Sequence, residues 1–73
     1  MIAIQAVLFD KNKYEYNNCI RWLLFHGFFR IINYRTTSQF HGFVLVEPNE
    51  TKYNYRLEQL EKSGIFYIVQ YGK

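Results

Sequence analysis

Cysteine, proline and glycine are all scarce in this chain, and each shortage excludes a class of protein. The only cysteine, Cys19, cannot form an internal disulfide, so the fold has no covalent staple. One proline and four glycines among 73 residues, of which 49% are apolar, do not fit a disordered chain. The length fits one domain over residues 1–73. A core of this size without a disulfide is only marginally stable, and small proteins often gain stability by forming oligomers.

Long apolar runs are also missing. None approaches the roughly 20 residues that cross a membrane. Residues 2–9 are apolar, but they contain Gln5, are followed by Asp10 and lack a preceding basic region, which excludes a signal peptide. We therefore expect an intracellular protein with no membrane partner.

Side chains with catalytic or metal-binding chemistry are few. Cys19, His26 and His41 are the only soft metal ligands, and their spacing matches no zinc site, which needs about four ligands. Cys19 and His26 share a helix face that is expected to pack on a sheet, where a thiol stays inert. The glycines are isolated, so no phosphate-binding loop is present. The sequence predicts no catalytic residue, metal, cofactor or small-molecule substrate, and hence no enzyme.

Aromatic side chains are present in excess. Seven Phe, seven Tyr and one Trp make up 21% of the chain. A small domain buries only about 60% of the surface of its unfolded chain, whereas each ring needs roughly 150–250 Å² of cover. Some rings must therefore lie outside, where they would form a contact surface for another chain or for nucleic acid.

The first half of the chain indicates a strand, a helix and a hairpin. Residues 2–9 form a short apolar run that is typical of a buried strand. A helix is predicted over 13–26, with Asn12 and Glu15 as a capping box and Gly27 as its stop. Two β-rich runs follow, 28–36 and 40–46, with a polar link at 37–39 that suits a hairpin.

The second half contains two conflicting signals. Residues 57–62 have high helix propensity and an i,i+4 pair, Glu58–Lys62, whereas Tyr53, Tyr55 and Leu57 alternate as in a strand. Helix over 51–62, followed by a strand at 65–71, gives a βαββαβ, ferredoxin-like α+β fold: an antiparallel sheet covered by helices. The alternative, with a strand at 53–59, is a five-stranded sheet covered by one helix.

The helix 13–26 is apolar on more than one side. Cys19, Ile20 and Leu23 lie on one stripe that should face the sheet, together with Tyr16 and His26. Phe25 points the opposite way and Leu24 lies on the border. Adjacent residues of a strand face opposite sides, so Phe28 and Phe29 cannot share one core. The predicted interface consists of Leu24, Phe25, Phe28 and Phe29, and its partner is a second copy of the chain, a homodimer first of all.

Nucleic-acid binding is the alternative. The net charge is +3, but the nine basic residues are scattered along the chain rather than clustered as in most nucleic-acid-binding domains. Single-strand binders combine basic side chains with aromatic rings on which bases stack. The residues predicted for such a contact are Lys11, Arg30, Tyr34, Arg35 and Tyr67.

Several short motifs occur together along most of the chain: AVLFDK at 6–11 with KY at 13–14, CxxWL at 19–23 with HGF at 26–28, FVLV at 43–46 before Pro48, YR at 55–56 and GI at 64–65. The combination resembles a small domain family of tailed phages and of large double-stranded DNA viruses of protists. The family has no established chemistry, so the resemblance implies a viral structural or interaction protein, packaged in the virion, or a module that helps to compact the viral genome. The sequence departs from the family at Cys19, usually a small Ala, and at Leu24 and Phe25, usually charged.

Overall fold

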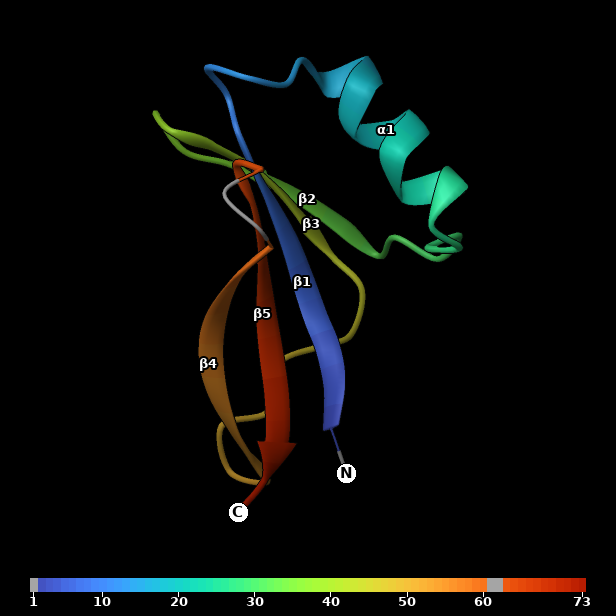
Figure 1. Ribbon diagram of the computed structural model, residues 1–73. Helices are drawn as coiled ribbons and strands as arrows, with labels where there is room; N and C mark the ends of the chain where they lie inside the picture. Colours follow the sequence, from blue (N-terminus) through green and yellow to red (C-terminus); the bar gives the residue numbers. More distant parts are fainter. Residues whose placement is uncertain (1, 61–62) are drawn as a thin grey trace.

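A computed structural model describes residues 2–60 and 63–73 and shows one helix packed on one face of an antiparallel sheet (Figure 1). The elements follow one another as β1 Ile2–Asp10, α1 Tyr16–Phe25, β2 Asn33–Thr36, β3 Phe40–Val44, β4 Tyr53–Leu60 and β5 Ile65–Gly72. The five strands lie in the order β2-β3-β1-β5-β4, so β2 and β4 form the two edges. The ferredoxin-like prediction is therefore wrong, and the alternative of one helix on a five-stranded sheet is confirmed.

The error lies in the region predicted as a helix over 51–62. Residues 53–60 form β4, which pairs antiparallel with β5 from Tyr53 opposite Gly72 to Leu60 opposite Ile65. Residues 61 and 62 lie outside the described part of the chain, and with them the expected Glu58–Lys62 pair. Leu57 to Leu60 are good helix formers, but strand pairing along all of β5 outweighs a local preference of a few tenths of a kcal/mol per residue.

The helix α1 is shorter at its beginning than the sequence suggests. Asn12 does not cap it, because its backbone N–H binds the Asp10 side chain at 2.8 Å in a turn that follows β1. The helix begins at Tyr16, and Glu15 occupies the cap position without a side-chain cap bond among the described residues. The predicted capping box is therefore wrong, whereas the predicted stop at Gly27, with φ of 85°, is confirmed.

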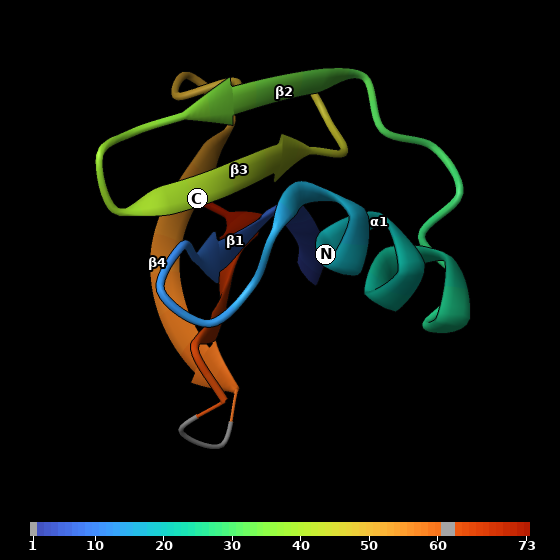
Figure 2. The ribbon, with the colours of Figure 1, turned by 90° about the horizontal axis from the view of Figure 1, so that it is seen from above.

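The core lies between α1 and the face of the sheet that it covers (Figure 2). Cys19 and Leu23 of α1 are fully buried there, as their helical spacing predicts, against a set of strand residues. That set comprises Val7, Phe9, Phe43 and Ile65. Of the other stripe residues, Ile20 packs partly against the core, whereas Tyr16 and His26 are exposed. The helix therefore contributes a narrower buried stripe than expected.

Residues 28–32 do not belong to a strand, although the sequence predicts one over 28–36. Phe28 packs on Trp22, with ring centroids 6.2 Å apart, and Ile31 packs partly against the core. These contacts hold the segment against the helix until β2 begins at Asn33. The predicted hairpin with a link at 37–39 is confirmed by the pairing of β2 with β3.

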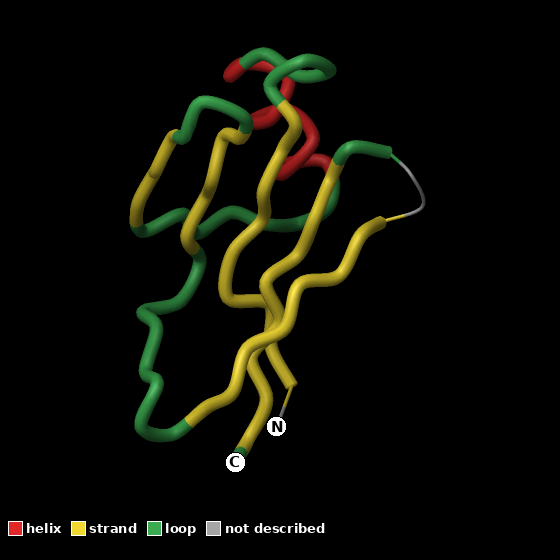
Figure 3. Tube along the Cα trace, turned by 90° about the vertical axis from the view of Figure 1, so that its left-hand side faces the viewer, coloured by secondary structure: helices red, strands yellow, loops and turns green. Residues whose placement is uncertain are grey.

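A segment between β3 and β4 crosses from one side of the sheet to the other (Figure 3). The register of β1 shifts between Ile4 and Ala6, which leaves Gln5 as a β-bulge. The Gln5 carbonyl accepts bonds from the backbone N–H groups of Leu45 and Val46, and its Nε2 donates to the Val46 carbonyl at 2.9 Å. The bulge therefore anchors the crossing segment, which passes over the face of the sheet that α1 leaves open.

Candidate interaction surface

Apolar side chains without cover gather at the C-terminal end of α1 and in the loop that follows it. Phe25 is 87% exposed, Phe29 76%, Leu24 50% and Ile32 43%. We call these four residues the aromatic patch. Three of them were predicted from the sequence as interface residues. The fourth predicted residue, Phe28, is half-buried against Trp22, so it supports the patch from beneath.

The end of the helix determines which phenylalanines point outward. The N–H of Phe28 donates to the Leu23 carbonyl at 2.8 Å, and the N–H of Gly27 donates to the Leu24 carbonyl at 3.1 Å. This pair of bonds, with Gly27 in the left-handed region, is a Schellman motif. The motif turns the chain back so that Phe28 packs inward, while Phe25 on the last helical turn and Phe29 on the loop remain outside.

Most of the other aromatic rings pack against one another in clusters. Phe9 meets Tyr14, Trp22 and Phe43 edge-on, at centroid distances between 5.4 and 5.6 Å. A second cluster joins Tyr16 and Tyr34, whose centroids are 5.2 Å apart. The small domain thus covers its rings mainly with other rings, and Phe25 and Phe29 are the two that are left more than three-quarters exposed.

The structure separates the residues predicted for nucleic-acid contact. Tyr34 and Tyr67 lie on the face of the sheet that carries α1, because they are paired with the core residues Phe43 and Val7. Tyr67 packs against Trp22 and Phe28, and burial raises the pKa of its hydroxyl. Arg35 lies on the opposite face.

The other two members of this set are also apart. Arg30 is exposed in the loop before β2, and the Lys11 ammonium donates to the carbonyl of Thr37. The basic groups and rings of the set are thus divided between the two faces of the sheet and the loops, so the geometry gives nucleic-acid binding less support than the aromatic patch gives protein contact.

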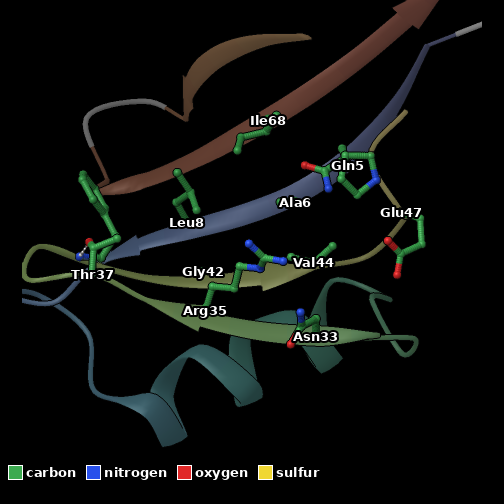
Figure 4. A pocket seen from close by; sticks show the side chains of 12 residues that line it. Gln5, Ala6, Leu8, Asn33, Arg35, Thr37, Gly42, Val44, Glu47 and Ile68 are labelled. Carbon is green, nitrogen blue, oxygen red and sulfur yellow. Dashed lines mark hydrogen bonds between the residues drawn. The ribbon is translucent and has the colours of Figure 1, made fainter. Parts of the chain in front are cut away.

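The open face of the sheet holds a cavity of about 310 Å³ that the sequence analysis did not predict (Figure 4). Its floor is apolar and consists of Ala6 and Leu8 of β1, Val44 of β3 and Ile68 of β5. Gly42 also lines this floor, where there is little room for a side chain. A Cβ at that position would lie 3.1 Å from a methyl group of Leu8 and 3.0 Å from the Arg35 carbonyl oxygen. The volume is at the lower limit of small-ligand sites.

The rim of the cavity carries both signs of charge. Arg35 reaches from β2 across β3, whereas Gln5 and Glu47 lie at one end and Thr37 at the other (Figure 4). An anionic ligand that pairs with Arg35 would be repelled by the Glu47 carboxylate at the same rim. A cation that pairs with Glu47 would be repelled by the Arg35 guanidinium. The cavity can hold a small apolar group, but its charges select no class of ligand.

The residues with nucleophilic or metal-binding chemistry are dispersed. Cys19 is fully buried in the core, and desolvation raises the pKa of its thiol from 9.0 to about 11, against a smaller lowering effect of a backbone hydrogen bond. His41 accepts or donates a 2.6 Å bond with the Tyr34 hydroxyl, and His26 stacks on Trp22. Within residues 2–60 and 63–73, no three His, Cys, Asp or Glu side chains meet as a metal site would require. Over the same ranges, no helix has both the length and the hydropathy of a membrane span.

Comparison with known proteins adds no family to these observations. No protein-family model, no curated protein and no solved structure matches the chain. The resemblance to the viral domain family stays a prediction from the short motifs, and the function has to be argued from the surface itself.

Proposed function

We propose that the protein is a structural or interaction protein that associates with a second copy of itself through the aromatic patch. The observation that carries this proposal is the exposure of Phe25 and Phe29, at 87% and 76%, in a domain whose other Phe, Tyr and Trp rings are all less than half exposed. Large exposed apolar side chains next to one another mark interaction surfaces in soluble proteins. Aromatic residues are also the usual energetic centres of interfaces. A viral origin and a place in the virion rest on the sequence resemblance alone.

The size of the patch fits the centre of a small dimer interface. Two phenylalanines at roughly 150–250 Å² each supply about 250–400 Å² per chain at the observed exposures. A standard interface buries about 800 Å² on each partner, so the phenylalanines cover about a third to a half of it. Leu24, Ile32 and the polar residues around them would supply the remainder as a rim. At about 25 cal/mol per Å², the phenylalanines of two chains would stabilise the dimer by roughly 12–20 kcal/mol before the cost of association is subtracted.

The experiment that tests the proposal compares two substitutions that add the same charge. Phe25→Glu places a carboxylate in the centre of the patch, whereas Ser38→Glu places one in the exposed β2–β3 turn. Circular dichroism establishes that each variant is folded, and sedimentation equilibrium gives its mass over a wide range of concentrations. We expect the wild type and Ser38→Glu to have the same mass, and Phe25→Glu to remain folded with a lower mass because the patch no longer associates. Equal association of all three proteins would show that the aromatic patch is not the interface.

A further inference from the structure

A second surface, the free edge of β4, has the geometry of a strand that pairs with another chain. β4 forms one edge of the sheet, and no other strand of the described residues lies beyond it (Figure 1). It runs over eight residues, Tyr53–Leu60, and its register with β5 is unbroken. The other edge, β2, has only four residues.

Natural sheets protect their edges with lysines, prolines, bulges or short strands. β4 is long, contains neither lysine nor proline, and shows no register shift along its pair with β5. Its only charged residues are Arg56 and Glu58, which have opposite signs. Leu57, near the middle of the strand, is 61% exposed. The unprotected backbone groups and this exposed leucine indicate that β4 is covered when the protein is assembled.

The charges of β4 select one way in which two copies can pair. Arg56 and Glu58 lie on the face of the sheet that carries α1, and Leu57 lies on the open face, as their partners in β5 show. A twofold axis perpendicular to the sheet keeps both faces continuous, so the possible antiparallel registers differ by steps of two residues. In the register centred on Leu57, each Arg56 lies opposite Glu58 of the second copy.

The two neighbouring registers are unfavourable. A step in one direction places Arg56 opposite Arg56 of the second copy, and a step in the other direction places Glu58 opposite Glu58. Like charges directly opposite each other destabilise a strand pair, whereas opposite charges and apolar pairs stabilise it. The Leu57-centred register alone combines two ion pairs with a leucine–leucine contact.

The arginine of this strand is already held in place within one chain. Arg56 Nε donates to Glu58 Oε1 at 2.8 Å, and its guanidinium carbon lies 5.4 Å from the centre of the Tyr71 ring. A side chain that is oriented before association loses less conformational entropy when a partner binds. The Glu58 carboxylate of a second copy would therefore meet a guanidinium that needs little rearrangement.

We propose that β4 pairs antiparallel with β4 of a second copy, in the register centred on Leu57, to join two sheets into one of ten strands. This contact is separate from the aromatic patch and does not depend on it. A chain that uses both twofold contacts would form assemblies larger than a dimer, since each copy would bind two neighbours.

The test reverses one charge at a time, in the wild type and again with Phe25→Glu to remove the aromatic patch. Arg56→Glu alone or Glu58→Arg alone places like charges opposite each other at two positions, and we expect each to weaken association by roughly tenfold. An equimolar mixture of the two variants restores opposite charges at both positions and should associate as the parent does. The double variant Arg56→Glu/Glu58→Arg serves as the matched control and should also associate normally.

The outcomes separate the two contacts. A Phe25→Glu protein that stays monomeric at every concentration contradicts edge pairing and leaves the aromatic patch in place. Association of the Phe25→Glu protein that falls with Arg56→Glu supports the edge. The patch is refuted if Phe25→Glu leaves the association of the wild type unchanged. If the single variants weaken association but their mixture does not restore it, the proposed register is wrong. Hydrogen exchange on the wild type gives a second measurement: amides of β4, and not those of β2, should become protected as concentration rises.

Discussion

Leu23→Ala tests the orientation of α1, which determines that Phe25 lies outside. Leu23 is fully buried with Phe9, Phe43 and Ile65 in the core between helix and sheet. Truncation of such a leucine removes its burial and leaves a cavity, which together cost about 2.7–5 kcal/mol. A domain of this length has a total stability of roughly 4–11 kcal/mol. We therefore expect loss of a large fraction of the stability, and a melting temperature lowered by about 11 °C or more.

The neighbouring residue provides the matched control. Leu24 is half exposed, so Leu24→Ala should change the free energy of unfolding by less than about 0.5 kcal/mol. Urea denaturation followed by circular dichroism measures both variants, with Phe25→Glu and Arg56→Glu present so that dissociation through either contact does not contribute to the transition. A loss below about 1 kcal/mol for Leu23→Ala, or an equal loss at both positions, would refute the described packing of the helix.

Two further predictions concern the end of the helix and the buried thiol. Gly27 has φ of 85° and no atom within 4 Å of an added Cβ. Gly27→Ala should therefore lower the free energy of unfolding by roughly 1–2 kcal/mol through backbone strain alone, and Gly27→Asn should lower it by less. Equal losses of stability for the two variants in denaturation experiments would contradict this. Cys19 keeps its proton in the folded state up to a pKa of about 11, against 9.0 as the ordinary value. Unfolding therefore releases a proton between these values, and stability should fall as pH rises from 9 to 11. Cys19→Ala should remove this part of the pH dependence, and an unchanged pH profile would show that the thiol does not contribute.

The sequence predicts those parts of the fold in which local pattern and tertiary contact agree. The apolar run 2–9 became the central strand β1, and Gly27 ended the helix with a left-handed residue. The strand at β4 was predicted only as the alternative, because helix propensity is a local signal. The alternation of Tyr53, Tyr55 and Leu57 decides in favour of a strand only when β5 lies beside it. The alternation was the signal that could have decided the matter.

The candidate surface was predicted only in part, for a similar reason. Helical periodicity was enough to place Phe25 outside and Leu23 inside. Whether Phe28 and Ile32 are buried or exposed depends on two backbone features. These are the Schellman turn and the 2.9 Å hydrogen bond from the Ile32 N–H to the Val44 carbonyl, and helical periodicity reveals neither. The cavity on the open face could not be found either, since it depends on how the crossing segment packs over the sheet.

The central claim, that the aromatic patch joins copies of this chain, is tested most directly by the mass of the native protein in solution. Light scattering during size-exclusion chromatography, at low and high salt and with and without a DNA oligonucleotide, gives that mass. We predict twice the mass of one chain or more, maintained or increased at high salt because apolar burial is not screened, and unchanged by the oligonucleotide. The mass of a single chain under all conditions, or a complex with DNA that dissociates steeply with salt, would contradict the account.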